Sequence, residues 1–370
     1  MRDVSTGDTP TRSVSRRKYL QLGAGASAVA LAGCLSSGDG LVYLCRGGVI
    51  EDAEREVLQE WEDENDIDIQ FESAADDSAM MEQISADPGG YDIVTLAPYG
   101  LALERHHPDY EDDDYLAELD FGEVPNYEEN IQEEWRNADF LQGDDKGMFY
   151  HISNQGLAYN TDELGEVSSW EDIKDPDLDG EVSLFDSAPT RFGQACAALD
   201  MDVAEVVDDL GDGDEEPFEQ VMGEVAEQHQ NVYQYWQAGD QFMQDLREGQ
   251  ATVASAWGGR VEMLARDEDV PVDYVIPEEG CVSWSVAFSI IEESDMKEEA
   301  YDLLNFIYEE ETATDLVEQH YYPMPLEGDH EVMEGRFESL DADNVVSFSW
   351  PHIFGAIDTI EEEFESIKHG

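Results

Sequence analysis

The chain has 370 residues, of which 90 are Asp or Glu and 18 are Lys or Arg, so its formal net charge is −72. Such a charge repels the phosphate backbone of nucleic acids and excludes an ordinary nucleic-acid-binding protein. Hydrophobic residues still make up 41% of the chain, which is too much apolar material for a disordered acidic chain. We therefore expect a folded protein, and the length predicts two domains.

The acidic residues are spread along the whole chain. This distribution is typical of proteins that work in concentrated salt, where a Debye length of about 3 Å at 1 M screens the repulsion between carboxylates. The composition predicts a halophilic protein, from a haloarchaeon-like source.

The first forty residues contain the features of an export signal. Arg16 and Arg17 precede a small, apolar run at 22–32, which is too short to span a bilayer. Paired arginines before such a run are typical of the twin-arginine (Tat) export pathway. Residues 31–34, Leu-Ala-Gly-Cys, then resemble the lipobox of lipoproteins. We expect residues 1–33 to be the signal, Cys34 the lipidated anchor and 34–40 a tether, which places the protein on the extracellular face of the membrane. The alternative is a buried N-terminal helix with an incidental cysteine.

The cysteine count excludes a disulfide scaffold. Once Cys34 is set aside, Cys45, Cys196 and Cys281 remain. Three cysteines form at most one disulfide and leave at least one thiol free. The sequence leaves open which of the three are paired.

From residue 41 onward, short apolar strands alternate with amphipathic helices. Strands are predicted by buried or alternating apolar runs at 41–44, 67–71, 91–96, 181–185, 231–236, 251–257 and 282–291. Helices are predicted by apolar spacing at 50–61, 191–199, 218–229, 260–266 and 356–368, with another ending at Arg247. The alternation predicts an α/β layer fold built from two units.

No motif of an enzyme stands out. The chain lacks Gly-x-Ser-x-Gly, His-Glu-x-x-His and Cys-x-x-Cys, and 90 carboxylates make chance pairs uninformative, so an exported hydrolase is a distant alternative. Asp175, Asp177 and Asp179 resemble half of a calcium loop, but Pro176 is unusual there and Asp186 stands where Glu is usual. We expect a turn at this place, and no metal, cofactor or catalytic residue.

Six short motifs resemble one family in unbroken order. They are 91–99 (YDIVTLAPY), 156–160 (GLAYN), the Ser-Trp pair at 169–170, 246–259, 282–284 (VSW) with 300–307, and 321–325 (YYPMP). Together they resemble the spermidine/putrescine-binding branch of family 1 of the extracellular solute-binding proteins, over about residues 41–370.

The resemblance implies a two-lobed, periplasmic-binding-protein-like fold of type II, with a ligand cleft between the lobes. Lobe 1 would comprise 41–152 and 286–322, and lobe 2 would comprise 153–285 and 323–370. It also implies a monomer that hands a small solute to an ABC transporter permease.

The family's ligand-binding aromatic residues match Tyr99, Trp257, Trp284 and Tyr322, and more loosely Trp350. Flat aromatic faces sandwich an alkyl chain and attract an ammonium group, although each residue alone is equally explained by core packing. Asp186 matches an acidic residue that holds an amine in the family. Its alternative role is to cap the next helix together with Ser187.

Four residues depart from a polyamine site. Val286 stands where the family has an amine-binding Asp, and Arg46, Arg191 and Arg260 lie at predicted edges of the cleft. Arginine binds carboxylate or phosphate groups through its planar fork, although each arginine is also explained by pairing with a surface acid. The leading ligand is therefore a polyamine, spermidine or putrescine, and the alternative is an anionic solute, a phosphonate or carboxylate, held by these arginines.

Overall fold

The computed structural model describes residues 40–74, 76–107, 110, 113–136, 145–333, 345–346 and 350–370. The predicted export signal, the anchor Cys34 and the tether up to residue 39 lie outside the described residues. No helix in these ranges is long and apolar enough to cross a membrane.

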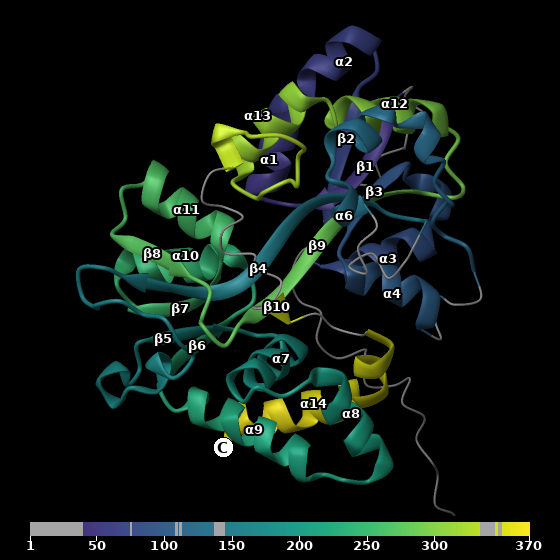
Figure 1. Cartoon of the computed structure of the whole chain (residues 1–370). Coiled ribbons are helices and arrows are strands. Elements are labelled where there is room, and N and C mark those ends of the chain that lie inside the picture. Colours follow the sequence, from purple (N-terminus) through teal and green to yellow (C-terminus); the bar gives the residue numbers. More distant parts are fainter. Residues whose placement is uncertain are drawn as a thin grey trace, which may run out of the picture. The chain divides into compact units, whose positions relative to one another are not determined.

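Ten strands of the described chain form one sheet with the order β2-β1-β3-β9-β4-β7-β5-β6, in which β10 also pairs with β9 and β8 with β4 (Figure 1). Their bounds are β1 Leu41–Arg46, β2 Ile69–Ala74, β3 Ile93–Leu96, β4 Met148–Asn160, β5 Val182–Phe185, β6 Val232–Trp236, β7 Val253–Trp257, β8 Val272–Val275, β9 Cys281–Ile290 and β10 Val345–Val346.

The helices of the described chain lie between and around these strands. They are α1 Val49–Val57, α2 Gln59–Asn65, α3 Asp77–Ala86, α4 Pro98–His106, α5 Pro125–Asn130, α6 Glu133–Arg136, α7 Ala188–Ala198, α8 Val203–Asp212, α9 Glu216–His229, α10 Gly239–Glu248, α11 Gly258–Asp267, α12 Lys297–Ile307, α13 Glu310–His320 and α14 Trp350–His369. The predicted α/β fold is confirmed, and each predicted strand and helix overlaps an observed one.

Two long strands, β4 and β9, connect two groups of shorter parallel strands. At one end β1 is parallel to β2 and β3, and at the other β5 is parallel to β6 and β7. The antiparallel pair β4 and β9 lies between the two groups, because β9 also pairs with β3 and β4 also pairs with β7 (Figure 1).

The buried apolar residues divide in the same way. One cluster draws on residues between 41 and 152 and between 286 and 326, whereas three others draw on residues between 157 and 282 and between 353 and 364. The chain therefore has the predicted two-lobed fold. Met324 and Leu326 pack in the first cluster although the predicted boundary assigns 323–370 to lobe 2. We propose that the chain crosses back to lobe 2 after Leu326.

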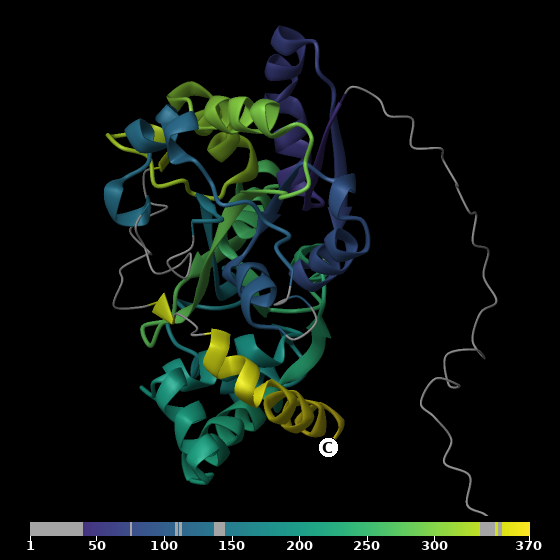
Figure 2. The ribbon, with the colours of Figure 1, turned by 90° about the vertical axis from the view of Figure 1, so that its right-hand side faces the viewer.

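The C-terminal helix α14 also touches both lobes. It packs along α7, α8 and α9, and it also contacts α4 of the first lobe (Figure 2). The contact with α4 places the ring of Phe354 5.8 Å from the ring of Tyr99, measured between centroids. This helix, like the two long strands, therefore connects the two lobes.

Candidate ligand-binding site

Trp257 and Trp284 meet where the two lobes join. Trp257 is the last residue of β7 and the N-cap of α11, while Trp284 lies within β9. Their rings meet edge to face, with centroids 6.3 Å apart and planes at 80°. Trp284 packs partly against the core of the first lobe and partly against that of the second. The structure therefore brings together two of the predicted ligand-binding aromatic residues.

Tyr322 lies beside the turn that begins α11. Its side chain is buried, and its ring centroid is 5.1 Å from that of His151 in β4. A Cβ atom placed on Gly259 would lie 3.0 Å from the Tyr322 ring, so the absence of a side chain at Gly259 permits this approach. Burial raises the pKa of the Tyr322 hydroxyl, and the nearby Arg260 and Arg46 oppose that rise.

Arg46 enters the site from the first lobe. It is the last residue of β1, and its Nη2 atom lies 2.5 Å from Oδ1 of Asp77. Asp77 is buried at the start of α3 and also accepts a hydrogen bond of 3.2 Å from the backbone N–H of Ala97. Burial lowers the pKa of His151 to about 3, and the charge of Arg46 adds to this effect. His151 is therefore neutral at physiological pH.

Arg260 reaches the same place from the second lobe. It lies in the first turn of α11, and its Nη1 atom is 2.9 Å from Oδ1 of Asp240, whose side chain is 86% exposed. A Cβ atom on Gly48, two residues after Arg46, would lie only 3.2 Å from Nη2 of Arg260. The guanidinium carbon lies 5.6 Å from the ring centroid of Trp257. Two of the three predicted arginines thus converge with two of the aromatic residues.

Tyr99 lies in the first turn of α4, beside this group. Its hydroxyl oxygen accepts a hydrogen bond of 3.2 Å from Ser78 Oγ, and its ring packs against Phe354. Burial raises the pKa of this hydroxyl, and the charge of Asp77 adds to the rise. The fifth predicted aromatic residue, Trp350, begins α14, but its side chain lies outside the described part of the chain.

Asp186 is occupied by an amine of the protein itself. Its Oδ1 atom lies 2.6 Å from Nζ of Lys368 in the last turn of α14, and its Oδ2 atom accepts a hydrogen bond of 3.0 Å from Gln237. The Lys368 ammonium also lies 4.8 Å from the ring centroid of Phe364 and 5.6 Å from that of Tyr235. Ser187, and not Asp186, caps helix α7 by accepting a hydrogen bond from the N–H of Thr190.

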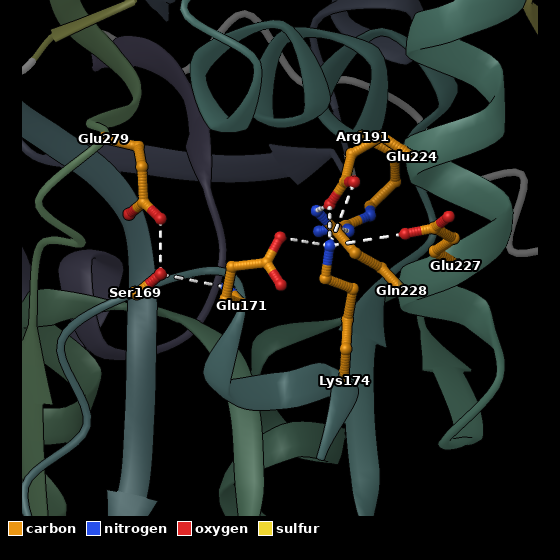
Figure 3. A network of polar contacts seen from close by, with 8 residues as sticks. All are labelled: Ser169, Glu171, Lys174, Arg191, Glu224, Glu227, Gln228 and Glu279. Atoms are coloured by element: carbon orange, nitrogen blue, oxygen red, sulfur yellow. Dashed lines mark hydrogen bonds and ion pairs between the residues drawn. The ribbon is translucent and has the colours of Figure 1, made fainter. Parts of the chain in front are cut away.

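Arg191 does not line the site, which corrects the sequence-based expectation. Its side chain is fully buried between α7 and α9, where it donates a hydrogen bond to Gln194. It donates another to Gln228 (Figure 3). Gln228 in turn bonds to Glu224, which accepts from Lys174 at 3.0 and 3.1 Å. Burial lowers the pKa of Arg191 to about 10, so it stays a cation that belongs to the interior of the second lobe.

Val286 is buried in the first lobe. Its side chain is 3% exposed and packs in the core of the first lobe, opposite His151 in the register of β4 and β9. The apolar residue found in place of an acid is therefore a core residue here.

The three remaining cysteines are buried free thiols, which answers the pairing question that the sequence left open. Burial raises the pKa of Cys196 and of Cys281 to about 12, and it also raises that of Cys45. Their thiols are therefore protonated and unreactive at neutral pH.

The acidic turn at 175–180 is a short 3-10 helix. Asp175 caps this helix, since its carboxylate accepts a hydrogen bond of 2.9 Å from the N–H of Asp177. Within the described ranges, no group of His, Cys, Asp or Glu side chains is arranged to hold a metal ion.

Three residues of the site were not identified from the sequence. They are Gly48, Asp77 and His151. His151 lies inside β4, a strand that apolar periodicity did not identify. Its first 12 residues are all buried, but some of them are polar, among them Asn154 and Gln155. Gly48 has a positive φ of 88°, a backbone conformation that favours glycine. The Gly-Gly sequence at 47–48 alone does not reveal this conformation.

Comparisons with known proteins support the fold and show the family. A model of the family of bacterial extracellular solute-binding proteins matches residues 56–328. The chain therefore belongs to this family, whose members are not enzymes but bind solutes for ABC transporters.

Individual relatives cover most of the chain. The spermidine/putrescine-binding periplasmic protein 1 of Haemophilus influenzae is 25% identical over 271 residues, which are 72% of this chain and 71% of that protein. The spermidine/putrescine-binding periplasmic protein of Escherichia coli is 23% identical over 323 residues, 85% of this chain and 88% of that protein. A substrate-binding protein of a spermidine/putrescine ABC transporter from Streptococcus pneumoniae superposes with a TM-score of 0.72 at 21% identity, covering 90% of this chain and all of that one.

Proposed function

We propose that this protein is the lipid-anchored substrate-binding subunit of an ABC importer. It is exported by the Tat pathway, is held at the outer face of the membrane by Cys34, and hands a small polar solute to a permease. The observation that carries the proposal is the meeting of side chains from both lobes at the junction, where Arg46 and Tyr322 face Arg260 and Trp257. A solute bound there contacts both lobes, so its binding favours the closed arrangement that a permease recognises.

Two ligand classes are consistent with this role. The polyamine interpretation is supported by the names of the curated relatives and by the aromatic residues Tyr99, Trp257, Trp284 and Tyr322, which suit an alkyl chain and an ammonium group. The interpretation as a binder of an anionic solute is supported by the two arginines that reach the junction.

A thermal-shift screen tests the role itself. Purified protein lacking residues 1–34 is melted in about 2 M KCl with putrescine and spermidine on one plate and with carboxylates, phosphonates and sugars on another. A binding protein is stabilised by its ligand according to the ratio of free ligand to Kd, about 2.7 kcal/mol at a hundredfold excess. A rise in melting temperature with one chemical class supports the role, and equal melting temperatures with every solute contradict it.

A further inference from the structure

Two buried N–H groups at the lobe junction have no acceptor in the described part of the chain. Nε of Arg46 and Nε1 of Trp257 are buried and have no hydrogen-bond partner among the described residues. The guanidinium of Arg260 lies over the Trp257 ring and close to Gly48, which follows Arg46 by two residues. A buried donor without an acceptor raises the free energy of a folded protein by about 1–3 kcal/mol in general. A solute whose oxygen atoms accept hydrogen bonds from these donors removes this cost.

The charges at the junction select the same kind of occupant. Protonated amines donate hydrogen bonds and accept none, so a polyamine satisfies neither Arg46 Nε nor Trp257 Nε1. A polyamine would also approach two guanidinium groups, although their ion pairs with Asp77 and Asp240 offset part of that charge. The acid predicted to hold a polyamine, Asp186, already binds Lys368. The position two residues after Trp284, where the resembled family has an amine-binding Asp, is the core residue Val286.

The helix ends add to this preference. Helix α1 begins after Gly48 and helix α11 after Trp257, and in the described structure neither N-cap residue accepts a hydrogen bond through its side chain. By contrast, Asp76 and Ser187 cap α3 and α7 with their side chains. The first turn of α11 carries no acidic residue, so its uncapped N–H groups and helix dipole add to the positive potential of the two arginines. In the first turn of α1, Glu51 and Asp52 oppose the dipole of that helix.

We propose that the solute carries a carboxylate or phosphonate group, which accepts hydrogen bonds from Arg46, Arg260 and the indole N–H of Trp257. The rings of Trp284, Tyr322 and Tyr99 contact its organic part. Arg46 belongs to the first lobe and Arg260 to the second. An anionic group that binds both arginines therefore stabilises the closed arrangement of the two lobes. This inference rests on the proposed function and names the substrate class of the same site.

The test compares two arginines of the second lobe. Arg260→Gln removes one of the proposed anion ligands, whereas Arg247→Gln removes the same charge from a surface ion pair with Glu268. A second variant, Arg46→Gln with Asp77→Asn, removes the other ligand without leaving the buried Asp77 carboxylate unpaired. Affinities of each protein are measured by titration calorimetry in about 2 M KCl for succinate, glutamate, 2-aminoethylphosphonate, putrescine and spermidine, and the melting temperature without solute confirms folding.

We expect at least one of the three acids to bind the parent protein and Arg247→Gln equally. The same acid should bind Arg260→Gln and the Arg46/Asp77 variant about 10- to 100-fold more weakly, as expected for the loss of a hydrogen bond to a charged group. Binding of putrescine or spermidine alone overturns the inference but keeps the proposed function. Acid binding that Arg260→Gln and Arg247→Gln weaken equally also overturns the inference, because it reflects overall charge. Binding of none of the five, together with a flat thermal-shift screen, overturns the proposed function.

Discussion

The ammonium of Lys368 and the carboxylate of Asp186 form an ion pair of 2.6 Å in which the two side chains are 13% and 15% exposed. The pair joins the last turn of α14 to the residue that follows β5, 182 residues earlier in the chain. Burial alone would lower the pKa of Lys368, but its hydrogen bonds to Asp186 and Glu365 raise it, so the pair persists at neutral and alkaline pH. Asp186, for which the sequence left amine binding and helix capping as alternatives, thus holds the C-terminal helix by an ion pair.

Loss of this ion pair should destabilise the fold. In Lys368→Gln the carboxylate of Asp186 keeps Gln237 but loses its counter-ion, and we expect the free energy of unfolding to fall by about 1–3 kcal/mol. Urea denaturation followed by circular dichroism measures the change. His369→Gln is the control, because this neighbour is 79% exposed. Equal urea midpoints for Lys368→Gln and the parent would show that the ion pair does not contribute to the stability of the fold.

Trp257 should contribute to solute binding more than a tryptophan of the core. Trp257→Phe keeps an aromatic ring but removes the Nε1 donor that has no partner in the described structure, so affinity should fall by up to about tenfold. Trp170→Phe is the matched control, since Trp170 is fully buried and its Nε1 donates to the carbonyl of Gly280 at 2.8 Å. This control should lose stability and keep its affinity. If both variants bind with unchanged affinity, Trp257 is a core residue.

Glu54 should make the protein less stable as the pH rises. It is 1% exposed in α1, where burial raises its pKa to about 8, although a hydrogen bond from the Tyr43 hydroxyl at 2.9 Å lowers it. In the unfolded chain a glutamate has a pKa of about 4.3. Between these two values the folded state keeps a proton that the unfolded state has lost, so stability falls as the pH rises from about 4.5 to about 8 and levels off above that.

Glu54→Gln should remove this dependence. The amide oxygen still accepts from Tyr43 but does not ionise, so the variant and the parent should have similar free energies of unfolding at pH 5. At pH 8 the variant should be more stable, with a difference that grows by at most about 1.4 kcal/mol per pH unit. Urea denaturation between pH 5 and pH 9 measures this difference. Glu56→Gln, an exposed change on the same helix, is the control, and parallel curves for Glu54→Gln and the parent would contradict the prediction.

The sequence predicted the fold better than the site, and individual residues show why. Apolar periodicity identified β7 and α11, and the motif around Trp257 placed that residue correctly at their junction. The partner of a charged side chain depends on contacts between distant segments, which periodicity does not encode. Arg191 therefore looked like a ligand although it is bonded to Gln228, and Asp186 looked available although Lys368 lies against it. Cys34 and the paired arginines lie outside the described residues, so the anchor stays a prediction.

The anchor can be tested independently of the fold. If Cys34 carries the lipid, Cys34→Ser should be exported and released into the medium, since the remaining segment 22–32 is too short and too weakly apolar to hold the protein in a membrane. Immunoblots of membrane and medium fractions measure the distribution. Cys196→Ser, which changes a buried thiol of α7, should stay with the membrane. Retention of Cys34→Ser in the membrane fraction would contradict lipidation at this residue.

The acidic composition should make stability depend on salt. The chain has 90 Asp and Glu but 18 Lys and Arg, and its formal net charge is −72. Most carboxylates therefore have no Lys or Arg to pair with. Between about 0.2 M and 3 M KCl the Debye length falls from about 7 Å to below 2 Å, so repulsion between exposed carboxylates is screened and the melting temperature should rise. Circular dichroism melts measure it. Sorbitol at equal osmolality is the control, because a neutral solute leaves charge repulsion unscreened. The prediction is wrong if the melting temperature does not change with KCl. It is also wrong if sorbitol raises the melting temperature equally, because the effect then does not come from screening of the carboxylates.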